Sequence, residues 1–165
     1  MVGGQETTTN LIGNGLLTLL RQPERLAEMR DRPEIADTAV EELLRYETPS
    51  QHTGRICRAD TLMGGKVIPK GAAVMAVMAA GNRDPERFPD PDRLDLARAD
   101  NRHLAFGWSA HFCFGAPLAR MEARIAFKAL LGRLCNVSLA TDKLEWRTNS
   151  GLRGLKSLPI TFTPA

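Results

Sequence analysis

FGWSAHFCFGAPLAR, residues Phe106 to Arg120, is the stretch that decides the fold. Its single cysteine, Cys113, stands in a loop shortly before Pro117, and proline is favoured in the first turn of a helix. The unpaired N–H groups and the positive dipole end at a helix start stabilise an anion. They therefore favour the thiolate, the form that binds a metal or attacks an electrophile. We interpret Cys113 as a chemically active residue; the alternative is a buried, inert cysteine.

The composition is that of one globular domain. The chain has 165 residues, of which 43% are hydrophobic and 25% charged, a balance that suits a packed core. Its three cysteines, Cys57, Cys113 and Cys135, are far apart and form no C-x-x-C pair. A disulfide framework or a zinc site is therefore not expected, and a reducing cytoplasm is the expected location.

Charge and hydropathy bear on the possible partners. No apolar run reaches the length of about 18 residues that a membrane span needs, and no basic-apolar leader is present. The net charge is +3, but the lysines and arginines are scattered rather than gathered into a dense block. We therefore expect neither membrane insertion nor nucleic-acid binding, whereas a modest basic face favours an acidic protein partner.

The periodicity predicts a mainly α-helical chain with small β-sheets (an α+β class). Helices are expected over residues 1–21, 23–29, 33–47 and 117–134, the last of them largely buried. Strands are expected over residues 54–58, 72–80, 137–139, 144–147 and 158–162, with a hairpin turn at Gly64-Gly65. Prolines and aspartates in residues 81–105 predict a long meander, packed by Phe88, Leu94 and Leu96.

The first predicted helix has an irregular beginning, GGQETTT. A threonine hydroxyl can bond to the carbonyl four residues earlier, which for Thr7 belongs to Gly3, and such bonding bends the local helix. The alternative is a frayed N-terminus with solvated threonines. Further along, Glu42 and Arg45 lie three residues apart on one helix face. They form either an exposed ion pair or a buried pair that is tied to another arginine.

Together these stretches resemble the haem-thiolate monooxygenases, the cytochrome P-450 family, and most of all its soluble bacterial members. The family loop reads F-G-x-G-x-H/R-x-C-x-G, and Phe106, Gly107, His111, Cys113 and Gly115 occupy those places. Ser109 stands where the family has a glycine, which puts the fine geometry of the loop in doubt.

The resemblance implies a haem b site. Cys113 would be the axial thiolate ligand of the iron, which favours O–O cleavage. Phe106 would pack near the sulfur and keep water away, and the backbone at Gly115 would belong to the same cofactor loop. Arg55 and His111 would donate hydrogen bonds to the haem propionates.

A second motif, GGQETT, resembles the family's oxygen-groove pattern A/G-G-x-D/E-T-T. The resemblance implies that Glu6 and Thr7 are catalytic, with Thr7 hydrogen-bonding the dioxygen and Glu6 in the proton relay. In the family the E-x-x-R pair joins an arginine of the meander. We assign that role to Arg93 rather than to Arg87, as a structural element and not a catalytic one.

The tail SGLRGLKSLPITF resembles the last hairpin of the family, whose turn near residues 152–155 often reaches the substrate pocket. A plain surface hairpin is the alternative. The whole chain, residues 1–165, is expected to be the C-terminal portion of a single P-450 domain, from the middle of the central helix onward, with the N-terminal portion absent.

The expected function is that of a monooxygenase, which inserts one atom of dioxygen into a small organic substrate. Electrons would come from NAD(P)H through a ferredoxin or a flavoprotein reductase. A second possibility is a non-catalytic truncated remnant that binds haem or serves as an interaction fragment. A third, a nucleophilic enzyme that uses Cys113 and His111, explains neither the Glu6-Thr7 motif nor the meander.

Overall fold

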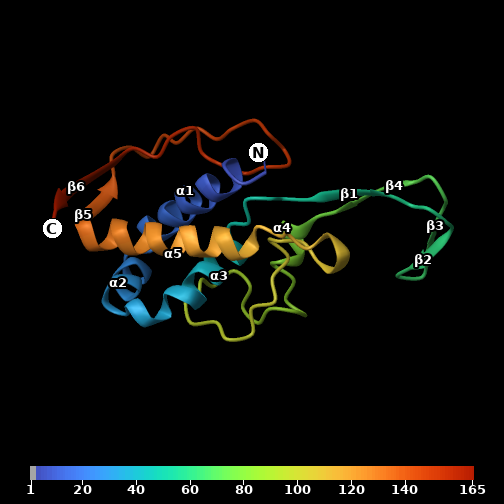
Figure 1. The fold of residues 1–165 in the computed structure, drawn as a ribbon, viewed down its shortest axis with the longest axis horizontal. Helices are drawn as coiled ribbons and strands as arrows, with labels where there is room; N and C mark the ends of the chain where they lie inside the picture. The colour runs from blue at the N-terminus through green and yellow to red at the C-terminus, as the bar shows by residue number, and fades with distance from the viewer. Residues whose placement is uncertain (1–2) are drawn as a thin grey trace.

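The computed structural model describes residues 3–165, and its long helices are joined by loops and short antiparallel sheets (Figure 1). The helices are α1 (Glu6–Leu20), α2 (Pro23–Asp31), α3 (Ala36–Tyr46), α4 (Met78–Gly81) and α5 (Ala116–Arg133), with 3-10 turns η1 (Pro33–Ile35) and η2 (Ser109–His111). The paired strands are β1 (Thr53–Ile56) with β4 (Ala73–Ala76), β2 (Thr61–Met63) with β3 (Lys66–Ile68), and β5 (Leu134–Leu139) with β6 (Ile160–Pro164). The mainly helical class with small sheets is confirmed.

The core lies where α1, α3 and α5 pack together (Figure 1). The apolar face of α3 is fully buried, and α5 adds a stripe at four-residue spacing, Ala123, Phe127 and Leu131. Gly15 of α1 allows the close approach of α5, because a Cβ at this position would stand 2.7 Å from Cζ of Phe127. The helices therefore form one hydrophobic core, and the loops of the site pack against it.

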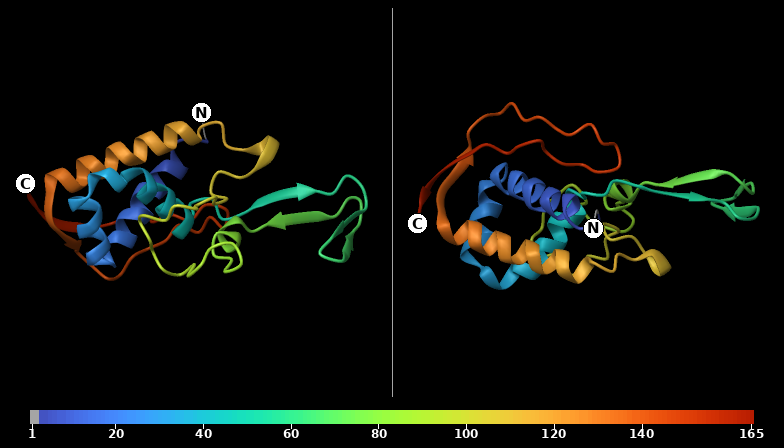
Figure 2. Two further views of the ribbon diagram at one scale, coloured as in Figure 1. Left: turned by 90° about the horizontal axis from the view of Figure 1, so that it is seen from below. Right: turned by 45° about the horizontal axis from the view of Figure 1, so that its top comes forward.

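Strands β1 and β4 and the β2–β3 hairpin form an arm that projects from the helices (Figures 1 and 2). Gly64 and Gly65 connect β2 to β3, with φ angles of 55° and 76° that favour glycine. The predicted Gly-Gly turn is thus confirmed. The expectation of one buried strand over residues 72–80 is wrong. Strand β4 ends at Ala76 and is largely exposed, because it belongs to a two-stranded ribbon, and α4 follows it.

Helix α5 also departs from expectation. It runs from Ala116 to Arg133, close to the predicted bounds, but it is not largely buried. Leu118, Met121 and Ile125 have 53%, 46% and 61% of their surface exposed, because only the opposite side of the helix meets the core. Apolar composition alone thus overstated how much of this helix other elements cover.

The beginning of the chain bears out the local prediction. Residues 1 and 2 of the predicted first helix lie outside the described part, and α1 begins at Glu6. The hydroxyl of Thr7 donates to the carbonyl of Gly3 at 3.1 Å, as the spacing predicts, and Thr9 does the same toward Gln5 at 2.9 Å. These two threonine hydrogen bonds therefore connect the glycine turn to the first turns of α1.

The meander and the tail are packed onto the helices. Residues 82–105 form an irregular segment whose Phe88, Leu94 and Leu96 are almost fully buried, as predicted. In the tail, the expected strand over residues 144–147 is a single bridge, Trp146 to Leu155. The tail turn lies against α1, since the Asn14 amide donates to the Arg153 carbonyl at 2.9 Å, so it is not a plain surface hairpin. No helix within residues 3–165 is both long and apolar enough to cross a membrane.

Candidate functional site

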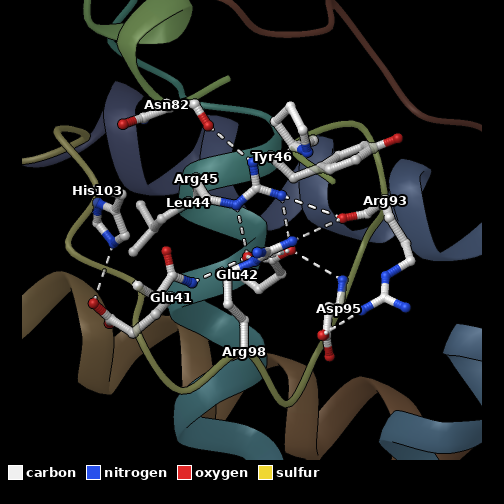
Figure 3. Close-up of polar contacts among 12 residues, drawn as sticks. Glu41, Glu42, Leu44, Arg45, Tyr46, Asn82, Arg93, Asp95, Arg98 and His103 are labelled. Carbon is white, nitrogen blue, oxygen red and sulfur yellow. Dashed lines mark hydrogen bonds and ion pairs between the residues drawn. The ribbon is translucent and has the colours of Figure 1, made fainter. Parts of the chain in front are cut away.

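A buried ion pair on α3 anchors the meander. Arg45 donates from Nε and Nη2 to the two carboxylate oxygens of Glu42, both at 2.8 Å, and neither side chain is exposed (Figure 3). Of the two alternatives, the buried pair is therefore present. Buried charges are stable only when they are paired and hydrogen-bonded, so this carboxylate requires further partners.

The third member of this cluster is Arg98, and the assignment of Arg93 is wrong. Arg98 Nε lies 3.2 and 3.1 Å from the two oxygens of Glu42, and its side chain is 9% exposed. The Arg93 side chain points outward to Asp95, and only its backbone carbonyl takes part, accepting from Arg45 at 3.3 Å (Figure 3). A turn from Asp95 to Arg98 brings the later arginine over the carboxylate, and linear spacing does not reveal such a turn.

Two further donors to Glu42 were missed by the sequence interpretation. The amide of Asn101 donates to Oε2 at 3.1 Å, and the Asp95 N–H donates to Oε1 at 2.9 Å. Neither residue type nor spacing marks them, because one is a common polar side chain and the other acts through its backbone. Glu42 thus holds the meander at several points along residues 95–101.

Asn82 connects the end of α3 to the approach of the cysteine loop. It is completely buried, its Oδ1 accepts from the Leu104 N–H at 2.7 Å, and its Nδ2 donates to Thr48 Oγ1 at 2.6 Å. Its carbonyl accepts from Arg45 at 2.8 Å (Figure 3). One side chain thereby fixes the chain two residues before Phe106.

The loop before α5 is held by its own backbone. The Cys113 N–H donates to the Phe106 carbonyl at 2.9 Å, and the Ala116 N–H donates to the Cys113 carbonyl at 3.2 Å. Gly107 and Ser109 both have left-handed backbones, with φ of 72° and 58°. Glycine adopts this conformation without cost, but serine does not, so Ser109 is strained where the family pattern has glycine.

The cysteine is accessible, and aromatic side chains around it are exposed. Cys113 is a free and exposed thiol. The exposed fractions of Trp108, Phe112 and Phe114 are 64%, 48% and 101%. A Cβ at Gly115 would stand 3.7 Å from Cys113 Sγ, in ordinary van der Waals contact, so Gly115 lies directly beside the sulfur. The loop therefore offers a thiol beside exposed apolar side chains, and the alternative is wrong in expecting this cysteine to be buried.

A second glutamate of α3, Glu41, faces this loop and escaped the sequence interpretation. Arg120 of α5 donates to its two oxygens at 2.6 and 2.7 Å, and His103 Nε2 lies 3.1 Å from Oε2. The Ala105 N–H donates to His103 Nδ1 at 3.2 Å, which leaves Nε2 as the donor to Glu41. Arg120 also lies over the Phe106 ring, 4.6 Å from its centroid.

The electrostatics of this group follow from its contacts. Burial by itself raises the pKa of Glu41, but hydrogen bonds and charge from Arg120 and His103 outweigh it and lower the pKa from 4.5 to about 2. The hydrogen bond to Glu41 raises the pKa of Arg120 against the effect of its burial, and the charge of Glu41 adds to the rise. Glu41 is therefore an anion, and Arg120 a cation, across the physiological range.

The remaining predicted site residues come from other elements. Glu6 and Thr7 begin α1, Arg55 lies on β1, and His111 is exposed in η2. All views place the start of α1 and the loop before α5 at the end of the helical part from which β1 and its arm project (Figures 1 and 2). Arg55 donates to Thr53 and Gly54 of its own strand, and within residues 3–165 no hydrogen bond or ion pair joins Glu6, Thr7 or Arg55 to the cysteine loop.

Comparison with known proteins decides the family. The cytochrome P-450 family model matches residues 27–160, which contain the E-x-x-R pair, the meander and the cysteine loop. The chain belongs to the cytochrome P-450 family. Two curated P-450 relatives are the monooxygenase PikC of Streptomyces venezuelae, 50% identical, and the biotin biosynthesis cytochrome of Bacillus subtilis, 45% identical. Each matches 98% of this chain, and the chain spans about 40% of the length of these relatives.

Solved P-450 structures have the same fold over this region. P450BioI, crystallised with an acyl carrier protein ligated to a hexadecenoic acid, superposes with a TM-score of 0.96 at 45% identity. The tirandamycin C-bound monooxygenase TamI superposes with a TM-score of 0.95 at 44% identity. Each comparison covers 98% of this chain and 41–42% of the solved one. The fold is therefore that of part of a P-450, a family of haem-thiolate monooxygenases.

Proposed function

We propose that this chain carries the cysteine-ligated part of a haem-thiolate monooxygenase, as the C-terminal portion of a P-450 domain, with Cys113 as the axial ligand. The observation that carries the proposal is the geometry of the loop before α5. It presents an accessible thiol at a helix start, with its backbone tied at Phe106 and exposed aromatic side chains around it. A thiolate at such a position is stabilised by the helix terminus.

The residues present suit haem b. The Cys113 thiolate would hold the iron, and the exposed cationic side chain of Arg55 together with His111 would donate to the propionates. Phe106 packs against the core, and its ring centroid lies 6.2 Å from that of Phe112, so its ring would help to keep water from the sulfur. Bound haem would supply the activation of dioxygen, of which one atom enters a small organic substrate.

Glu6 and Thr7 would deliver protons from the start of α1. Because the Thr7 hydroxyl donates its own proton to the Gly3 carbonyl, its oxygen lone pairs can accept a hydrogen bond. Glu6 lies in the same turn and is partly exposed, so its carboxylate can take a proton from solvent. This pairing of a hydroxyl and an acid is suited to proton delivery.

Electrons would come from NAD(P)H through a ferredoxin or a flavoprotein reductase. The net charge of +3 supports an acidic docking partner, since opposite charges speed association. The relatives' names refer to different pathways, from biotin to polyketides, so the substrate class is proposed only as a small organic molecule.

One observation favours a second candidate function. Helix α5 exposes Leu118, Met121 and Ile125, three large apolar side chains on one element. A chain with this surface would bind haem or a partner protein without turnover. The two candidates agree on the cysteine ligand and differ in whether the chain by itself oxidises a substrate.

Reconstitution with haemin tests the ligand. We expect the reduced, carbon monoxide-bound protein to show the red-shifted band of thiolate ligation. Cys113→Ala should abolish this band, whereas Cys57→Ala and Cys135→Ala, as matched controls, should retain it. A wild-type protein without the band, or a band that survives in Cys113→Ala, overturns the proposal.

Turnover is tested separately on the reconstituted protein. NADPH, a ferredoxin and its reductase are added with a panel of small organic substrates, and oxygenated product is measured. Product formation that is lost in Thr7→Ala supports the monooxygenase. A thiolate band without product supports the second candidate.

A further inference from the structure

Two neighbouring glutamates of α3 serve different segments. Successive helical residues point about 100° apart, so Glu41 and Glu42 face different sides. Glu42 holds the meander through Arg98, whereas Glu41 faces His103 (Figure 3). Glu41 also pairs with Arg120 of α5. The sets share no side chain in these contacts, so their effects are separable by mutation.

The Glu41 partners stand on either side of the cysteine loop. His103 precedes Phe106 by three residues, and the two rings lie 5.9 Å apart. Arg120 follows Cys113 by seven residues, on the second turn of α5, and its Cζ lies 4.6 Å from the centroid of the Phe106 ring. The Phe106 carbonyl in turn accepts from the Cys113 N–H at 2.9 Å. One carboxylate is thus connected to both flanks of the loop.

We propose that Glu41 is a positioning residue that fixes the two ends of the cysteine loop through His103 and Arg120, and so holds Cys113 in place for iron ligation. The loop-fixing role stands on the contacts alone. Its consequence at the iron rests on the proposed haem-thiolate function.

Other contacts do not replace this one. The Glu42 set reaches only to Asn101, and Asn82 holds the backbone at Leu104, both before the loop. Within residues 3–165, the hydrogen bonds recorded for the Arg120 side chain go to Glu41 alone. Loss of Glu41 therefore frees Arg120 and removes the hydrogen bond of His103 Nε2 at the same time.

The chain contains a matched control. Arg124 lies one turn beyond Arg120 on α5 and pairs at 2.6 Å with Asp37, one turn before Glu41 on α3. This second pair joins the same two helices, but it is more exposed and lies one helical turn further from the loop. Arg124→Gln therefore removes an α3–α5 ion pair without touching His103 or Phe106.

Hydrogen exchange of the haem-free protein is the first test. In Glu41→Gln and Arg120→Gln we expect the amides of Ala105, which donates to His103 Nδ1, and of Cys113 to exchange about tenfold faster than in wild type, because local opening of the loop becomes easier. Amides of α1 and the Arg124→Gln control should be unchanged. Unchanged loop exchange in both variants overturns the proposal, and uniformly faster exchange throughout the chain shows a global effect and also overturns it.

The haem-loaded protein gives the second readout. Glu41→Gln should convert a large share of the thiolate-type carbon monoxide band to the shorter-wavelength form, and Arg124→Gln should not. Glu41→Asp, which keeps the charge, should restore part of the band. If wild type forms no thiolate band, the proposed function fails while the exchange result still decides the loop-fixing role. If wild type and Glu41→Gln give the same band, the positioning role fails alone.

Discussion

Arg98 Nε lies 3.1 Å from Oε2 of Glu42, whose side chain is completely buried. The contact joins a meander that has no regular structure to the most buried turn of α3. Removing one partner of a buried ion pair costs a large free energy, because the other charge stays buried without compensation. This single contact therefore contributes strongly to holding the meander on α3.

Replacement of Arg98 should therefore reveal the third member of the cluster. We expect Arg98→Met to lower the free energy of unfolding by about 3 kcal/mol, because it leaves the Glu42 charge under-compensated. Arg93→Met should change it by less than about 0.5 kcal/mol, since the Arg93 side chain is exposed. Urea unfolding followed by circular dichroism measures both, and equal effects would contradict the assignment of Arg98.

Replacement of Ser109 by glycine should stabilise the protein. Its φ of 58° strains a residue with a Cβ, so Ser109→Gly should raise the free energy of unfolding by about 0.5–1 kcal/mol. Ser157→Gly is the control, because Ser157 is exposed and its φ is not positive. Thermal unfolding of the two variants provides the comparison, and destabilisation by Ser109→Gly would show that the serine side chain contributes more than its backbone strain costs.

Two glycines of α1 should respond oppositely to alanine. A Cβ at Gly15 meets the buried Phe127 ring at 2.7 Å, so Gly15→Ala should cost about 1–3 kcal/mol. Nothing lies within 4 Å of a Cβ at Gly13, so Gly13→Ala should stabilise the helix by up to about 1 kcal/mol. Urea unfolding measures the difference, and a similar effect at both sites would contradict the close approach of α5 to α1.

Glu41 should make the free energy of unfolding depend on pH in the acid range. Its pKa is lowered from 4.5 to about 2, so its contribution to stability is fully present above pH 4.5 and is lost as the pH falls toward 2. Glu41→Gln should remove this part of the pH dependence while other carboxylates keep theirs. Unfolding at pH values from about 5 down to about 2 measures it, and Glu24→Gln, at an exposed site of α2, serves as the control.

Much of the chain was predictable because its signals are local. The Gly64-Gly65 turn, the Thr7 bond to Gly3 and the helix after Cys113 depend on residues that are near neighbours in the sequence. The motif around Cys113 was sufficient for the family, which the comparisons confirm. The catalytic and cofactor roles of Glu6, Thr7, Arg55 and His111 stay predictions.

What required the tertiary structure were contacts between distant segments. Local patterns indicate that a residue is charged or apolar, but not which segment covers it. For this reason Arg93 was chosen over Arg98, and α5 and β4 were expected to be more buried than they are. The pairing of Glu41 with Arg120, 79 residues later, leaves no trace in spacing. Residue order thus determined the turns, the helix starts and the family motif, whereas the packing of α3 against α5 decided which charges meet around the cysteine loop, because only folding brings them within hydrogen-bond reach.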